Sequence, residues 1–166
     1  VQPTNMEIYV CNVDGSDLRQ VTNLGNANWS PFFHPSNEKI IFCSNHESML
    51  GFPFNLYMID IDGTNLEQIT YDKKFASFPV FSNDGERIFY QTGGFLFGNL
   101  TKSLHSVKLD GTDSKKHVSS EYAQRFSISP DNKSIAWSEL YKVYTAALPM
   151  TGQSVVLTSK STTHPV

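Results

Sequence analysis

The residues that could do chemistry in this chain are few and widely spaced. Two of its five histidines, His34 and His46, lie in turn-forming stretches close to one another in the sequence. Imidazoles bind zinc and related metals when several ligands converge on one point. A lone histidine in a turn is more often solvated, so we favour solvation over a metal site here. The patterns His-Glu-x-x-His, Gly-x-Ser-x-Gly and Cys-x-x-Cys do not occur, and the sequence indicates no cofactor.

A calcium site is the second chemistry that the side chains suggest. Asp60, Asp62 and Asn65 offer oxygen ligands at close spacing. In the calcium-binding loop that this spacing resembles, glycine occupies the sixth place. Here Gly63 stands at the fourth place counted from Asp60, which fits a tight hairpin turn instead. The sequence therefore predicts a turn at this point and no bound metal.

The elements that carry these residues recur along the chain. Residues 55–70 predict a strand, a tight Asp-Gly turn and a second strand, and residues 6–22 are a near copy displaced by 48 positions. Weaker copies follow at 104–118 and 142–158. Glycine in such a turn supplies a positive φ at little cost. Self-similarity at this period is typical of a repeat architecture.

A second module alternates with this hairpin. Residues 31–45, 79–92 and 125–139 each predict an apolar strand, a polar turn and another apolar strand. Pro31 and Pro79 are expected at the first position of their strands, because proline cannot donate to a ladder. The complete unit thus has four strands, a to d in chain order. We expect a half unit at 6–22 and complete units at about 29–72, 77–119 and 124–158.

Four-stranded units at this period are typical of the blades of a β-propeller. The segments SPDNKSIAW (129–137) and SNDGERIFY (82–90), with the hairpins at 6–22 and 55–70, resemble TolB-type propeller repeats. That family shows a Ser-Pro-Asp-Gly turn, a Tyr-containing c strand and an Asp-Gly-Ser/Thr turn. The chain is therefore predicted to be all-β, a partial propeller of about three and a half blades.

The resemblance also implies a place and a role. TolB-type proteins are periplasmic or extracellular bacterial proteins that bind partners through the propeller, so we expect the same localisation. Residues 94–166 further resemble propeller regions that accompany amidohydrolase domains in secreted bacterial proteins. Neither resemblance places a catalytic residue on this chain. Because the chain begins at Val1, we expect a mature or excised fragment.

Composition narrows the classes of partner. The net charge of −3 does not favour nucleic acid, whose binding domains usually carry a clustered basic face. No run of residues approaches the length of a membrane span, so we expect no membrane insertion. The aromatic fraction of 13% favours half-buried strands. Cys11 and Cys43 both lie in apolar strand patterns and are predicted to be buried free thiols rather than a disulfide.

Candidate binding residues follow from the blade pattern. The a strands of a propeller line its central channel, so their ends should face a partner or a small ligand there. Arg125 is the strongest candidate, since a cation beside the channel could hold an anionic group. For Trp29 and Phe78 we favour a place in the core over contact with a ligand, and they are candidates by position alone. The loops at 45–53 and 92–103 are longer than a hairpin needs and either bind or cover a sheet edge. The candidates are Arg125, Trp29, His34, His46, Phe78 and Ser82, with Phe32 and Ser127.

Two functions from different classes remain open at this stage. The first is a non-enzymatic scaffold of TolB type that binds a protein partner, including a second copy of itself. The second is an accessory propeller of a secreted amidohydrolase or serine peptidase whose catalytic residues lie outside this chain. An enzyme complete within these residues is disfavoured. Three and a half blades cannot close a ring of ordinary size. We therefore expect either a homodimer in which two arcs complete one ring of about seven blades, or a longer protein that supplies the missing blades in the same chain.

Overall fold

The computed structural model describes residues 5–49, 52–71, 75–93, 102–120, 123–139, 142–148 and 155–156, and this part of the chain is all β-structure without a helix. Three four-stranded antiparallel sheets follow one two-stranded sheet. The strands are β1 (Tyr9–Val10), β2 (Arg19–Gln20), β3 (Asn28–Phe33), β4 (Lys39–Ser44), β5 (Asn55–Asp60), β6 (Glu67–Gln68), β7 (Phe75–Phe81), β8 (Arg87–Gly93), β9 (Lys102–Lys108), β10 (Lys115–Ser120), β11 (Ala123–Ile128), β12 (Ser134–Glu139), β13 (Lys142–Ala147) and β14 (Val155–Val156).

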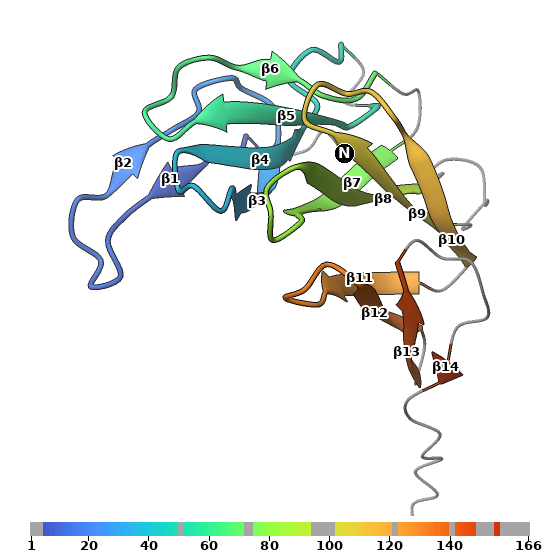
Figure 1. Ribbon diagram of the computed structural model, residues 1–166. Helices are drawn as coiled ribbons and strands as arrows, with labels where there is room; N and C mark the ends of the chain where they lie inside the picture. The colour runs from blue at the N-terminus through green and yellow to red at the C-terminus, as the bar shows by residue number, and fades with distance from the viewer. Residues whose placement is uncertain are drawn as a thin grey trace, which may run out of the picture.

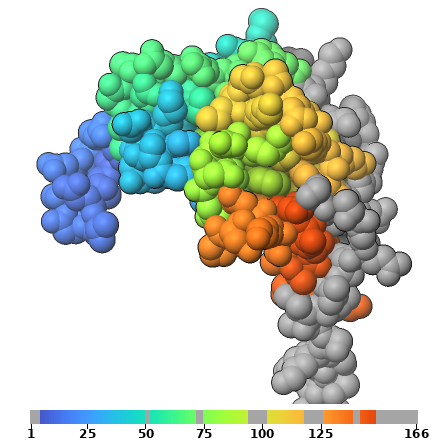
Figure 2. Space-filling model, in the orientation of Figure 1, coloured from blue at the N-terminus to red at the C-terminus, as the bar shows by residue number. Residues whose placement is uncertain are grey.

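The sheets follow one another as blades along an open arc (Figure 1). We call β1–β2 the half-blade, β3–β6 blade 1, β7–β10 blade 2 and β11–β14 blade 3. Each blade runs in simple order, with every strand paired to its neighbour in sequence. Figure 2 shows the same progression at the surface, from the blue half-blade at one end to the orange and red blade 3. The predicted all-β partial propeller is thereby confirmed.

The turns between strands c and d depend on glycine, as predicted. Gly15, Gly63 and Gly111 all have positive φ, at 85°, 88° and 78°. In the second of these turns, Asp62 Oδ1 accepts hydrogen bonds from the Thr64 backbone N–H at 2.9 Å and from its hydroxyl at 2.7 Å. These bonds hold the pKa of the Asp62 carboxyl below its ordinary value. The turn at Gly152 lies outside the described residues.

Two of these glycines, Gly63 and Gly111, lie against the preceding blade. A Cβ on Gly63 would lie 2.9 Å from the backbone oxygen of Val21, which follows β2. A Cβ on Gly111 would lie 2.7 Å from the backbone oxygen of Ile69, which follows β6. Real Cβ atoms essentially never come so close to a carbonyl oxygen. Glycine is therefore required here twice over, for its φ and for the close approach of two blades.

A threonine closes the c–d hairpin where the short d strand ends. The hydroxyl of Thr22 accepts the Ile8 N–H at 2.8 Å, and that of Thr70 accepts the Leu56 N–H at 2.9 Å. Each hydroxyl replaces one rung of the ladder. In blade 2 the equivalent position is Val118, and there the d strand β10 pairs with β9 on both sides of a register shift between Lys116 and Val118.

Both faces of the b strands β4 and β8 are buried. Ile40 and Phe42 of β4 pack with the half-blade, whereas Ile41 and Cys43 pack in the core that blades 1 and 2 share. This explains why the b strand reads as a continuous apolar run rather than an alternating one. Blades 2 and 3 share a smaller cluster in which Leu104 contacts Ile135, Trp137 and Ala146.

Two predictions about particular residues were wrong. Cys43 is a buried free thiol as predicted, and burial raises its pKa. Cys11, also free, is exposed; among the described residues, β1, which ends just before it, pairs as a strand with β2 alone. Pro31 and Pro79 lie in the interior of β3 and β7, not at their first positions. Each stands where the pairing register shifts, and a bulge tolerates a residue without an N–H.

Candidate binding site at the bulges of the inner strands

The first strand of each blade carries a bulge at the same place. The register of β3 shifts between Trp29 and Phe32, and that of β7 shifts between Ser77 and Val80. The shift in β11 lies between residues 123 and 126. A bulge changes which face the following side chains point to, and bulges are enriched next to functional sites.

The bulges are also strained. Ser30 has a φ of 55° and Phe78, 48 positions later, has a φ of 51°. A bulky aromatic residue with positive φ is a genuine outlier that costs on the order of 1–3 kcal/mol. Such strain persists only where the surrounding structure holds it in place, and it concentrates at sites that bind or react.

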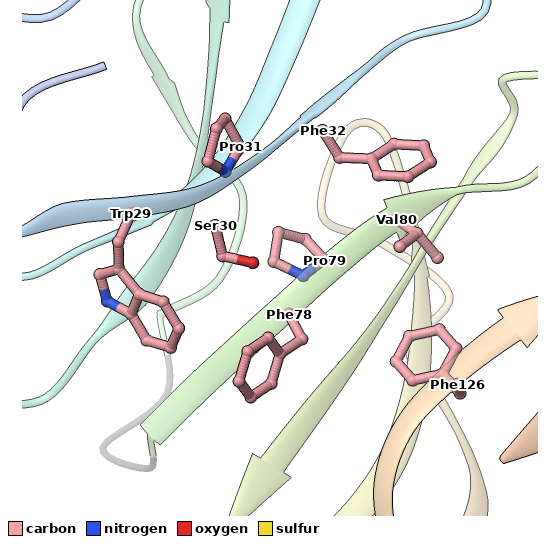
Figure 3. A pocket seen from close by; sticks show the side chains of 8 residues that line it. All are labelled: Trp29, Ser30, Pro31, Phe32, Phe78, Pro79, Val80 and Phe126. Atoms are coloured by element: carbon pink, nitrogen blue, oxygen red, sulfur yellow. The ribbon is translucent and has the colours of Figure 1, made fainter. Parts of the chain in front are cut away.

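Three inner strands converge at these bulges on one cavity of about 390 Å³, which we call the bulge cavity (Figure 3). Residues from three successive blades can meet only on the inside of the arc, so the cavity faces the propeller's channel. Ser30 supplies the one polar side chain among its lining residues. The lining consists of Trp29, Ser30, Pro31, Phe32, Phe78, Pro79, Val80 and Phe126.

Trp29 is held in place by a ring of aromatic neighbours. Its ring lies 5.3 Å from that of Phe78 at an angle of 88°, and 5.9 Å from that of Phe54 at 78°. Such edge-to-face pairs are favourable beyond the area they bury. Phe32, by contrast, is 43% exposed. The cavity therefore combines a rigid aromatic wall with an accessible aromatic side chain at its mouth.

The structure places the predicted site residues in three different settings. Trp29, Phe32 and Phe78 line the bulge cavity. Trp29 and Phe78, for which a place in the core was the alternative, also pack on one another. Ser127 is exposed and is not among the lining residues. Arg125 belongs to β11, but its side chain lies outside the described residues. The same holds for residues 50–51 and 94–101 of the two long loops.

His34 links blade 1 to blade 2. Its Nε2 donates to the backbone oxygen of Gly85 at 3.2 Å, and its ring packs edge-on against Phe81 at 4.8 Å. A Cβ on Gly85 would lie 2.4 Å from that imidazole, so glycine makes room for the histidine. Ser82 is buried in the corresponding turn, where its hydroxyl bonds to Asp84. Both residues lie in the turn that joins strands a and b of their own blade.

His46 lies at the opposite end of the β3–β4 pair from His34, so the structure does not bring the two together. Its Nδ1 is 2.9 Å from Ser44 Oγ, and its ring packs on that of Tyr57 at 4.5 Å. Burial lowers the pKa of His46, although Glu47 and Glu7 oppose this. Within the described residues, no group of three His, Cys, Asp or Glu side chains is placed to hold a metal.

Sequence reasoning missed five of the lining residues: Ser30, Pro31, Pro79, Val80 and Phe126. The signal that could have found them is a proline inside an otherwise regular strand pattern, because a proline in a paired strand marks a bulge or an edge. Since a bulge reverses the alternation of faces, the inward set cannot be read from alternation alone.

Four-stranded antiparallel sheets that follow one another along an arc, with inner strand beside inner strand, define a β-propeller. The chain belongs to the family described as the TolB beta propeller domain, whose model matches residues 1–155. A comparison with curated proteins finds no match.

Solved structures support the fold. The chain is similar to a protein assigned as TolB from Agrobacterium tumefaciens, with a TM-score of 0.73 and 18% identity over 92% of this chain and 56% of that one. It is similar to TolB from Acinetobacter baumannii, with a TM-score of 0.71 and 18% identity over 92% of this chain and 37% of that one. An oligogalacturonate lyase in complex with manganese matches at a TM-score of 0.66 and 14% identity, over 93% and 42% of the two chains. The chain thus spans roughly a third to a little over half of these structures.

Proposed function

We propose that this chain is a non-enzymatic protein-binding module of TolB-like type and that it contacts its partner through the bulge cavity. The observation that carries the proposal is the convergence of three inner strands, two of them strained at Ser30 and Phe78, on an aromatic cavity with two prolines in its lining. Binding sites are typically concave and mostly apolar with a few polar groups, which describes this lining. Within it, Ser30 is the only hydroxyl and no lining side chain is ionisable, which favours binding over catalysis.

The expected partner inserts an apolar side chain into the bulge cavity. Interface residues that dominate affinity are large, rigid and surrounded by groups that exclude water. Trp29 and Phe78 supply such a wall, while Phe32 at the mouth can close over the inserted group. A peptide segment with an aromatic or branched apolar anchor fits these features best.

The test uses a pair of neighbouring phenylalanines. Peptides selected from a random library against the chain are titrated by calorimetry into the native protein and into Phe32→Ala and Phe33→Ala. The two side chains are similarly exposed, at 43% and 46%, but only Phe32 lines the cavity. We expect Phe32→Ala to weaken binding at least about tenfold and Phe33→Ala to leave it unchanged. Equal effects of the two changes would refute the assignment of the cavity.

A second function rests on the oligogalacturonate lyase match. In that case the chain is an accessory propeller of a secreted hydrolase or lyase, and its catalytic residues lie outside it. The sequences flanking this chain in its gene distinguish the two functions. A His-x-His metal pattern or a Gly-x-Ser-x-Gly elbow downstream supports the accessory role, and a TolB-type neighbouring domain supports the scaffold.

We also propose a periplasmic or extracellular location, from the family to which the chain belongs. Within the described residues no helix is long and apolar enough to cross a membrane. Fusion to a signal-less reporter that is active only outside the cytoplasm tests the location when it is expressed with the native upstream sequence.

Self-association is the third part of the proposal. The c strand β1 pairs only with β2, whereas β5, β9 and β13 pair on both sides, so β1 has one open edge. Tyr9 and Leu18 of the half-blade are exposed. A second copy could cover these surfaces and complete a ring. Light scattering at micromolar concentration should then report twice the 18.7 kDa mass of the chain, and a cooperatively unfolding monomer would exclude it.

A further inference from the structure

A second cavity, of about 300 Å³, lies between blades 2 and 3, and unlike the bulge cavity it has ionisable side chains in its lining. Blade 2 contributes most of its walls from β8, β9, β10 and the turn that precedes β8. Blade 3 contributes Asn132 from a turn and Leu148 from the end of β13. We call it the inter-blade cavity, and its lining consists of Ser82, Asp84, Glu86, Arg87, Phe89, Ser106, Lys115, His117, Asn132 and Leu148.

The face of blade 2 that lines this cavity can be compared with the corresponding face of blade 1, which packs against blade 2. Three of the lining positions, on β8, β9 and β10, have counterparts 48 residues earlier in blade 1. Those counterparts pack into the apolar core between blades 1 and 2, and they are Ile41, Met58 and Ile69.

In blade 2 the three positions are Phe89, Ser106 and His117. A core methionine and a core isoleucine are thus replaced by a serine and a histidine at an interface of the same kind. Burying a polar side chain is costly unless it is hydrogen-bonded, so apolar packing alone does not explain why serine and histidine stand at these positions. Departures from a locally consistent pattern concentrate at functional sites.

The replaced side chains form an ordered chain of hydrogen bonds. The hydroxyl of Ser106, which is fully buried, accepts from Arg87 Nη2 at 3.1 Å and lies 2.8 Å from His117 Nε2. That oxygen also accepts from Arg87 Nε at 3.3 Å, so the guanidinium contacts it through two nitrogens. Phe89 stacks on the imidazole at 5.5 Å. The back wall of the cavity is therefore rigid and positively charged.

Charges of both signs surround the cavity. Asp113 pairs with Arg87 at 2.7 Å and with Lys115 at 3.2 Å, so two cations share one carboxylate. Lys115 is half exposed and can turn toward a ligand. Asp84 and Glu86 also line the cavity: the carboxylate of Asp84 accepts from Asn132 Nδ2 at 2.9 Å, and Glu86 is exposed.

We propose that the inter-blade cavity binds a small zwitterion of the α-amino acid class. The ligand carboxylate lies against Lys115 and Arg87. These two cations share the single carboxylate of Asp113, so the three groups together carry a net charge of +1. The ligand ammonium lies against Glu86, and its short side chain lies toward Phe89 and Leu148. A volume of about 300 Å³ is at the lower end of small-molecule sites and suits a ligand of this size.

The first experiment compares three probes on the chain as it is. Nitrogen-15-labelled protein is titrated with L-alanine, acetate and ethylamine at millimolar concentration, and amide shifts are followed at residues 84–89, 106 and 115–117. We expect L-alanine to shift these amides and to bind at least about tenfold more tightly than either single-charge probe. Equal binding of acetate would overturn the zwitterion in favour of a simple anion site, and no shift with any probe would overturn the site itself.

Variants then locate the ligand. Lys115→Gln should weaken L-alanine binding about tenfold, whereas Lys116→Gln, whose exposed side chain points to the other face of β10, should not. The double variant Ser106→Met, His117→Ile restores the residues of blade 1 and fills the cavity. We expect it to fold with an unchanged or higher denaturant midpoint and to lose binding. Retained binding in a folded double variant would overturn the proposal.

Discussion

Two histidines of this propeller are kept neutral by their surroundings. Burial is the main reason that the pKa of both His46 and His117 lies below its ordinary value of 6.5, and Arg87 adds to the effect on His117. Between the lowered pKa and 6.5 the unfolded chain binds more protons than the folded one. Stability is therefore complete above about pH 6.5 and is lost as the pH falls through that value toward the lowered pKa.

Urea unfolding at several pH values tests this expectation. The midpoint should fall between about pH 7.5 and about pH 5.5, above the range in which aspartates titrate. The double variant His46→Asn, His117→Gln should show a flatter profile over the same window, because its groups cannot take up a proton. A native profile that is already flat, or that rises toward acid, would contradict the prediction.

Substitutions of the c–d turn glycines can distinguish the cost of backbone strain at positive φ from the cost of a steric clash between blades. Gly63 and Gly15 have almost the same φ, but a Cβ on Gly63 would meet the Val21 carbonyl oxygen and a Cβ on Gly15 would meet nothing within 4 Å. Gly15→Val should thus show only the strain of a β-branched residue at positive φ, about 1–3 kcal/mol. Gly63→Val should cost more, because it also pushes two blades apart. Denaturant midpoints of both variants measure the difference, and an unaltered Gly63→Val protein would show that the turn is not as described.

The turn glycines were predictable from sequence, and the cavity residues largely were not. An Asp-Gly pair between two apolar runs is a local signal with a local cause. The positions of Val80 and Phe126 depend instead on bulges, which shift the inward face by one residue and are fixed by pairing with the neighbouring strand. For the same reason Trp29 and Phe78 could be proposed as candidates by position alone, with a place in the core favoured over contact.

At the scale of the elements, side-chain hydrogen bonds as well as backbone hydrogen bonds hold the short d strands to the c strands. Thr70 Oγ1 accepts the buried N–H of Leu56 at 2.9 Å and lies 3.1 Å from Asn55 Oδ1. Thr70→Val keeps the shape and leaves that N–H unpaired, so we expect a loss of about 1–3 kcal/mol in the free energy of unfolding. Thr70→Ser keeps the hydroxyl and should lose far less. Chemical denaturation of both variants measures this, and equal losses would mean that packing of the methyl group dominates.

The strands themselves follow from the 48-residue period, which predicts their number and order in each unit. Their lengths do not follow from it, because β2 and β6 have only two residues each while β10 in the same place has six. The reason is a single exchange in the repeat. Where Thr22 and Thr70 end the ladder with a hydroxyl, Val118 has none, and the backbone pairing continues past it.

At the scale of the whole molecule, the joins between blades are unequal. Blades 1 and 2 share a large apolar core, whereas blades 2 and 3 share a smaller one beside the inter-blade cavity. We expect blade 3 to open first when denaturant is added. Native-state hydrogen exchange should therefore show lower protection in β12 and β13 than in β4 and β8. Uniform protection across the blades would contradict this ranking.

The contact of Gly63 and of Gly111 with the preceding blade has a consequence for how such a chain can grow. The carbonyl oxygen of Val21 lies against Gly63, and that of Ile69 lies against Gly111. The second contact repeats the first 48 residues later in the sequence. Blade 1 therefore takes part in both contacts, through Gly63 with the half-blade and through Ile69 with blade 2. If a segment of one period were duplicated, the new blade would already have the residues for this contact with the blades on either side of it. No new interface would have to evolve. Loss of one period would leave the remaining contacts equally well matched, so gene duplication and deletion in steps of one blade are the changes in length that this architecture tolerates best.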